Sequence, residues 1–210
     1  NRYSSNALIN TIDKYKIKSV YVFYPAQFWP HKNHIYILKS LLILEKKYDI
    51  IVSAVFSGGD KGNKQFIVDY ARKLGIQDRV IFTGFISNIE IISHYKSSLA
   101  LVMPSFFGPT NIPPIEAFNL GTPVIYPDLP GFSDQIGAAG LLVDIYDPNS
   151  LSECLFRLIT NKNLRTDLTK KGYKVFERYK NFNRIKVLNK VLEEFIIKYS
   201  TYNNNQYINF

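Results

Sequence analysis

Residues 99–126 read LALVMPSFFGPTNIPPIEAFNLGTPVIY and contain two short apolar runs on either side of a proline-led segment. The runs Leu99–Met103 and Pro123–Tyr126 predict strands. Between them, Pro113–Leu120 predicts a helix, because two prolines favour its start and Gly121 favours its end. A strand, a helix and a second strand in this order indicate a parallel pair joined by a right-handed crossover. The stretch therefore favours an α/β fold.

The same alternation continues on both sides of this stretch. It predicts further strands at Val20–Tyr24, Ile50–Phe56, Val80–Thr83 and Leu141–Asp144, and further helices at Ile35–Lys46, Gln65–Leu74 and Ile89–Tyr95. Strands separated by single helices predict a Rossmann-like, open, mostly parallel sheet of about six strands flanked by helices. Beyond Pro148 the pattern predicts only helices, at Leu151–Ile159, Leu164–Tyr179 and Ile185–Ile197.

The pattern predicts one domain with short segments at its two ends. We expect a lead-in segment at 1–17, the α/β domain at 18–180, a C-terminal helix at 181–200 and a disordered tail at 201–210. With 210 residues, 46% of them hydrophobic and 20% charged, the chain does not have the composition of a disordered protein. No apolar run is long enough to span a membrane, and residues 1–17 lack the apolar core of a signal peptide, so we expect a cytoplasmic location.

The net charge of +9 is unevenly distributed. Residues 1–50 carry +5, residues 51–150 carry −3, and residues 151–210 carry +7. Basic ends suggest an anionic partner, which would be nucleic acid, a phosphorylated metabolite or an anionic membrane surface. A solvated lysine-rich surface without any partner explains them equally well. No zinc-finger, basic-zipper or RNA-recognition motif occurs, which argues against nucleic acid.

The candidate ligand site lies on the loops that follow the strands, because open parallel sheets bind ligands at the carboxyl ends of their strands. No G-x-G-x-x-G follows a strand, and residues 58–64 lack P-loop spacing, so a dehydrogenase or another dinucleotide-binding enzyme is disfavoured. The pair Pro113-Pro114 favours a preformed helix start, which leaves the amides of Asn111 and Ile112 free to meet an anion. Lys32 would bring a positive charge to the same crevice.

Several other residues allow a structural and a functional interpretation. Glu116 is either a local helix-cap partner or an acceptor for ribose hydroxyl groups. His31 and His34 are three residues apart, but no carboxylate is near them in sequence, so we expect no metal site. We expect Trp29 to be a packing anchor rather than a stacking platform, and the lone Cys154 to be a core residue.

Residues 104–124, PSFFGPTNIPPIEAFNLGTPV, also carry a family pattern. The residues of this stretch that fall in register with the pattern are Pro104-Ser105, Pro113, Glu116-Ala117 and Gly121–Val124. Two other segments also fall in register, Lys32-Asn33 and Val80–Gly84. Over residues 18–180 the chain resembles the C-terminal, donor-binding half of a retaining glycosyltransferase of family 4, also called group 1, with the two-domain GT-B fold.

This resemblance implies a hexose transferred, with retention, from a GDP- or UDP-sugar to a lipopolysaccharide, glycolipid or polysaccharide acceptor, as in bacterial surface-polysaccharide assembly. It implies that Lys32 and Glu116 are catalytic, Lys32 by neutralising the diphosphate and Glu116 by binding the ribose. It implies that no metal or other cofactor is required. The implied donor-binding residues are Gln27, Lys32, Phe85, Ile86, Gly108, Thr110, Asn111, Ile112, Pro113 and Glu116, with Phe85 and Ile86 against the base and Asn111 and Ile112 against the distal phosphate.

The chain departs from the family pattern at two positions. Gln27 stands where members usually have arginine, and Gly108 stands where they usually have glutamate. We expect the surroundings to compensate; the alternative is a catalytically weak or non-catalytic module that binds a nucleotide-sugar. The implied partners are a missing N-terminal acceptor domain, without which the chain would be inactive, and an anionic surface at the inner face of the cytoplasmic membrane.

Overall fold

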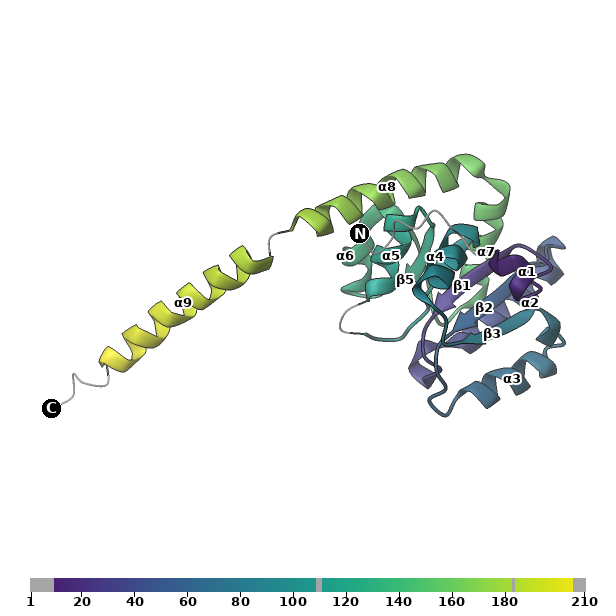
Figure 1. Ribbon diagram of the computed structural model, residues 1–210, viewed down its shortest axis with the longest axis horizontal. Helices are drawn as coiled ribbons and strands as arrows, with labels where there is room; N and C mark the ends of the chain where they lie inside the picture. The colour runs from purple at the N-terminus through teal and green to yellow at the C-terminus, as the bar shows by residue number, and fades with distance from the viewer. Residues whose placement is uncertain (1–9, 109–110, 183, 206–210) are drawn as a thin grey trace. The chain divides into compact units, whose positions relative to one another are not determined.

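The computed structural model describes residues 10–108, 111–182 and 184–205 (Figure 1). Its core is one six-stranded parallel sheet in the order β3-β2-β1-β4-β5-β6, which confirms the predicted fold class. The strands are β1 Tyr21–Pro25, β2 Ser53–Ser57, β3 Val80–Gly84, β4 Ala100–Val102, β5 Val124–Pro127 and β6 Gly140–Val143. Strand β2 begins three residues later than predicted; the apolar Ile51 that extended the prediction is 57% exposed.

Helices alternate with the strands along the chain. They are α1 Thr11–Lys14, α2 His34–Tyr48, α3 Lys64–Lys73, α4 Asn88–Ser97, α5 Ile112–Leu120, α6 Phe132–Ile136, α7 Pro148–Thr160, α8 Lys162–Asn181 and α9 Arg184–Asn205, with a 3-10 turn, η1, at Pro30–Lys32. Helix α2 packs against α3 and α7, whereas α4 packs against α1 and α5 (Figure 1). The sequence pattern does not predict α1, α6 or η1, because elements of three to five residues are too short to show a period.

Strand β1 has the burial expected of the middle of such a sheet. Tyr21, Val22, Phe23 and Tyr24 are each at most 1% exposed, so both faces of the strand are covered. Full burial of side chains of this size contributes about 1.5–3 kcal/mol each. Cys154 is also buried, as predicted.

Residues 11–17, which fall in the predicted lead-in segment, belong to the packed structure. The side chain of Asn10 caps α1 by accepting a hydrogen bond from the Asp13 amide at 3.2 Å. Ile17 is only 6% exposed and lies in the hydrophobic core. This segment therefore contributes to the fold.

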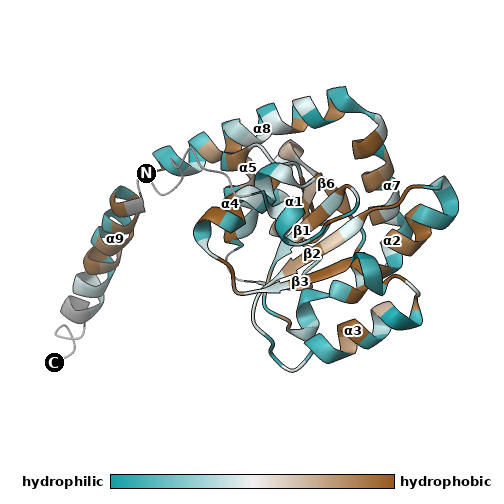
Figure 2. Ribbon diagram, turned by 45° about the vertical axis from the view of Figure 1, so that its right-hand side comes forward, coloured by the Kyte–Doolittle hydropathy of each residue, from teal (hydrophilic) through white to brown (hydrophobic). Residues whose placement is uncertain are grey.

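The chain divides into two compact units, the first ending at Phe176 and the second beginning at Glu177. Helix α9, in the second unit, continues to Asn205 and so includes residues 201–205 of the predicted tail, while 206–210 lie outside the described residues. Apolar and polar residues alternate along α9 (Figure 2). Within the described residues, no helix combines the length and the hydropathy needed to cross a membrane.

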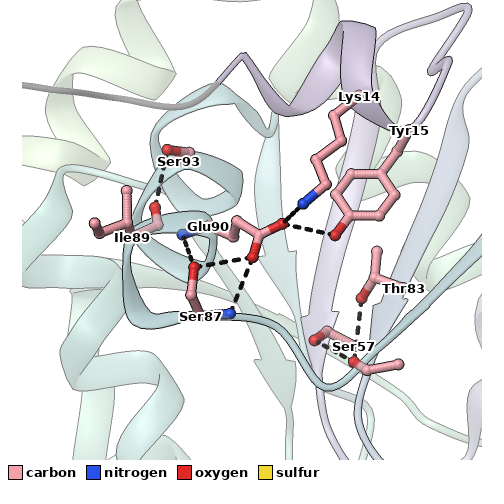
Figure 3. Close-up of polar contacts among 9 residues, drawn as sticks. Lys14, Tyr15, Ser57, Thr83, Ser87, Ile89, Glu90 and Ser93 are labelled. Atoms are coloured by element: carbon pink, nitrogen blue, oxygen red, sulfur yellow. Dashed lines mark hydrogen bonds and ion pairs between the residues drawn. The ribbon is translucent and has the colours of Figure 1, made fainter.

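The carboxylate of Glu90 ties α1 to α4 and to the loop after β3 (Figure 3). It accepts hydrogen bonds from Lys14 Nζ at 2.5 Å, Tyr15 Oη at 2.8 Å and the Ser87 amide at 3.0 Å. Ser87 Oγ caps α4 in return, by accepting from the Glu90 amide at 3.3 Å. These contacts, chiefly that with Lys14, lower the pKa of Glu90 from 4.5 to about 2.

We expect Glu90→Gln to lower the free energy of unfolding at neutral pH by about 2 kcal/mol, since hydrogen bonds to a charged group are lost. The folded-state pKa of Glu90 lies below its unfolded value, so its contribution is complete above pH 4.5 and fades as the pH falls towards 2. Urea unfolding at several pH values measures this. An equal difference between wild type and variant at pH 7 and at acid pH would contradict the assignment.

Candidate functional site

The candidate site lies where β1 and β4 are neighbours in the sheet. From β1 the chain continues through α2 to β2 on one side, and from β4 through α5 to β5 on the other. Adjacent parallel strands whose connections depart in opposite directions leave a crevice at their carboxyl ends, and this is the usual ligand site of open α/β sheets. The loops after β1 and β4 border this crevice.

Ser105, in the loop after β4, joins the two loops. Its buried Oγ donates to the carbonyl oxygens of Phe107, at 2.8 Å, and of His31, at 3.4 Å. The Phe106 amide donates to the same His31 carbonyl at 3.0 Å. These contacts hold the loops in a defined position before any ligand arrives.

The amine of Lys32 lies at this junction. Lys32 Nζ donates to Ser105 Oγ at 3.4 Å, and among the described residues no carboxylate forms an ion pair with it. Burial lowers the pKa of Lys32 from its ordinary value. A half-buried cation without a counterion favours an anionic ligand.

The start of α5 lies beside the same loops. Asn111 precedes the helix and its side chain makes no capping hydrogen bond, so within the described residues the N-cap side chain leaves the first amides of α5 open to a ligand. The Asn111 carbonyl accepts from Gln135 Nε2 at 2.6 Å, and Gln135 Oε1 accepts from Tyr126 Oη at 3.0 Å. Gln135 lies on α6, which the sequence did not reveal, so this support of the loop was missed.

Glu116 is held by a neighbouring helix. Its Oε2 accepts a hydrogen bond at 3.1 Å from Tyr95 Oη, on α4, and Tyr95 also reaches the Pro113 carbonyl at 3.4 Å. None of the hydrogen bonds described for Glu116 goes to the backbone at the start of α5, so the helix-cap alternative has no support. Tyr95 was not recognised in the sequence, where it is one apolar residue of a short helix.

Gly108 and Asn111 share one small space. A Cβ at Gly108 would lie 2.7 Å from Asn111 Oδ1, closer than real Cβ contacts come. The Asn111 side chain, 8% exposed, therefore occupies the volume that a side chain at position 108 would need. Thr110, another expected donor-binding residue, lies outside the described residues.

The remaining expected site residues lie on the same edge of the sheet, but farther from Lys32 and the start of α5. Gln27 is exposed, and its Oε1 accepts from Trp29 Nε1 at 3.1 Å. Phe85, 82% exposed, and Ile86 follow β3, two strands from β1. The Phe85 ring covers Gly59, where an added Cβ would come within 2.8 Å of it.

Trp29 and His34 lie in different surroundings. Trp29 is 41% exposed, so its interpretation as a packing anchor is wrong. His34 is buried among Tyr24, Phe28 and Phe56, and burial lowers its pKa to about 3. Among the described residues no group of three or more His, Cys, Asp or Glu side chains is placed to hold a metal ion.

Comparison with known proteins gives a family and a fold. A family model described as "Glycosyl transferases group 1" matches residues 10–175. The O-antigen chain mannosyltransferase RfbU of Salmonella typhimurium is 33% identical over 122 residues, which are 58% of this chain and 33% of the relative. A D-inositol 3-phosphate glycosyltransferase of Corynebacterium urealyticum is 26% identical over 161 residues, which are 74% of this chain and 38% of the relative. The chain thus spans about a third of the length of these relatives.

Two solved structures share the fold. The C-terminal domain of the glycosyl transferase group 1 family protein LpcC from Francisella tularensis superposes with a TM-score of 0.69 at 22% identity, over 82% of this chain and 92% of that one. Anabaena HepE in complex with UDP gives a TM-score of 0.71 at 16% identity, over 88% of this chain and 50% of that one.

We expect Lys32→Met to weaken pyrophosphate binding about tenfold or more, because one charged hydrogen bond is worth about 1.5–3 kcal/mol. Isothermal titration calorimetry at low and high salt measures this, and added salt should narrow the difference. Lys96→Met, at an exposed position at the far end of α4, is the control and should bind like wild type. Equal affinities for the Lys32 variant and wild type would remove Lys32 from the anion site.

Proposed function

The chain belongs to the group 1 glycosyltransferases, and we propose that its α/β unit binds the nucleotide-diphospho-sugar donor of such an enzyme. The donor is a GDP- or UDP-sugar, and its hexose passes with retention to a lipopolysaccharide, glycolipid or polysaccharide acceptor. The observation that carries the proposal is the Lys32 amine at the crevice between β1 and β4, which is half-buried and has no carboxylate partner among the described residues.

The diphosphate of the donor is the leaving group, and it gains negative charge as the sugar departs. A fixed cation and oriented backbone amides stabilise such charge without a reorganisation step. Lys32 supplies the cation, and the amides of Asn111 and Ile112 at the start of α5 supply the dipoles. The contacts of Ser105 and Gln135 support this role, because they fix both loops in advance.

Glu116 binds the ribose. Tyr95 occupies its Oε2, and no hydrogen bond to Oε1 is found within the described part of the chain, so Oε1 is available to accept from a hydroxyl group. Phe85 and Ile86 line the base, on the loop that Glu90 and Ser87 fasten. Gln27, exposed in the loop after β1, adds a neutral hydrogen-bonding group at the rim of the donor site.

Asn111 takes the place of the carboxylate that the resemblance leads us to expect at Gly108. Its amide fills the space beside Gly108 and can both donate to and accept from sugar hydroxyls. This supports the expectation that Asn111 compensates for the missing carboxylate at Gly108. The second candidate function is a catalytically weak or non-catalytic nucleotide-sugar-binding module, and the uncharged Gln27 and Gly108 favour it.

We propose that the activity of the whole protein depends on parts beyond this chain, which spans about a third of the length of the relatives compared. We propose an N-terminal acceptor domain as its partner, a cytoplasmic location, and a peripheral contact of the basic ends with an anionic membrane surface. Without the acceptor domain the cleft does not close around the donor. The 210-residue chain should therefore bind donor and transfer no sugar.

The ribose assignment can be tested with Glu116→Gln and matched nucleotides. Wild type should bind UDP or GDP about tenfold more tightly than the 2′,3′-dideoxy diphosphate, and the variant should lose this preference, because the carboxylate that accepts from the hydroxyls is gone. Calorimetry on both nucleotides measures the difference. Glu153→Gln, at an exposed site on α7, should keep the preference. A preference that survives in the Glu116 variant would contradict the proposal.

We propose that binding requires no metal, and nucleoside diphosphate affinity should accordingly be the same in EDTA and in Mg²⁺. The charge of the diphosphate is met by Lys32 and by helix amides, and within the described residues no carboxylate pairs with Lys32. Calorimetry with both additives checks this. An affinity that fell in EDTA and returned with Mg²⁺ would show that the site uses a metal-bound nucleotide.

A further inference from the structure

Helix α5, which carries Glu116, is held on both sides by a single residue of α4. In the first half of the helix, Tyr95 Oη donates to Glu116 Oε2 at 3.1 Å and lies 3.4 Å from the Pro113 carbonyl oxygen. Just beyond the end of the helix, Thr122 Oγ1 donates to the Tyr95 carbonyl at 2.8 Å. Tyr95 therefore fixes both the helix and the carboxylate on it.

Tyr95 is itself held in one position. Its side chain is completely buried, and its ring packs edge to face on Phe23 of β1, with the ring centroids 5.1 Å apart. Ser98 Oγ donates to the Tyr95 carbonyl at 3.0 Å. A tyrosine has only two side-chain torsions, so a buried ring places its hydroxyl group in a defined direction. A glutamate side chain has more rotatable bonds and loses more entropy when it is ordered.

The contact between Tyr95 and Glu116 leaves the carboxylate with one occupied and one available oxygen. A phenolic hydroxyl has a single proton, and the shorter of its two contacts is the one to the charged carboxylate, where a hydrogen bond is stronger than to a neutral carbonyl. With Oε2 fixed, Oε1 is held in one direction before a ligand binds. Ordering the carboxylate in advance removes a cost that binding would otherwise carry.

We infer that Tyr95 is the positioning residue for ribose recognition by Glu116. The inference rests on the proposed function, and it deepens that function by naming the group that makes the chain prefer a nucleotide with ribose hydroxyls. Tyr95 acts through Glu116 and not by touching the ligand, because none of its surface is exposed. Its phenolic hydroxyl should therefore affect ribose binding and leave diphosphate binding by Lys32 unchanged.

The test uses Tyr95→Phe, which keeps the buried ring and removes only the hydroxyl. Calorimetry on the 210-residue chain should show UDP or GDP binding weakened about threefold to tenfold, with the affinity for the 2′,3′-dideoxy diphosphate and for pyrophosphate unchanged. Unchanged pyrophosphate binding also shows that the variant is folded. The matched control is Tyr21→Phe, since Tyr21 is also buried and its Oη donates to a backbone carbonyl, that of His94, at 3.3 Å. It should bind all three ligands like wild type.

A double-mutant cycle with Glu116→Gln separates an effect through the carboxylate from a general effect on α5. If Tyr95 acts through Glu116, Tyr95→Phe should weaken UDP or GDP binding in the wild-type background and cause no further loss in the Glu116→Gln background. Additive losses in the double variant would overturn the inference.

Two other results would also overturn it. Equal weakening of the ribose and dideoxy nucleotides by Tyr95→Phe would show that the hydroxyl supports α5 as a whole. A wild-type preference for ribose in Tyr95→Phe would show that Glu116 needs no positioning by it. Failure of the proposed function is distinct, because the wild-type chain would then bind neither UDP nor GDP, or Glu116→Gln would keep the preference for ribose.

Discussion

The pairing of β1 with β4 is the constraint on which the site depends. Val22 faces Ala100 and Phe23 faces Leu101 across this pair, in the buried centre of the sheet. Because β4 follows β3 in sequence but lies beside β1, the chain must cross the sheet before it forms this pair. The crossing brings the loops that carry Lys32 and Asn111, almost eighty residues apart, to one edge, where Ser105 can join them.

The sequence predicts this frame well because its signals are local. Apolar runs bounded by glycine and proline mark the six strands, and the strands need only be parallel for their following loops to share an edge. The location of Lys32, Gly108 and Asn111 on strand-end loops could therefore be predicted without coordinates. That these residues contact a nucleotide-sugar donor is implied only by the family resemblance. Ligand-binding measurements test it.

The details that sequence could not supply are those set by distant partners. Tyr95 reaches Glu116 from another helix, and Gln135 reaches Asn111 from the short α6, so neither contact leaves a pattern along the chain. Trp29 was misjudged for a related reason. A single aromatic residue in a loop has no periodicity, and only the arrangement of Lys61, His31 and Phe107 around it shows that it belongs to an exposed stack.

The shared space of Gly108 and Asn111 also affects how this sequence can evolve. A glutamate introduced at 108 would collide with the Asn111 side chain, and a smaller residue at 111 alone would leave the site with neither carboxylate nor amide. The two positions are thus epistatic: which side chain position 108 can carry depends on the residue at 111, and a change at either one alters what the other contributes to the site.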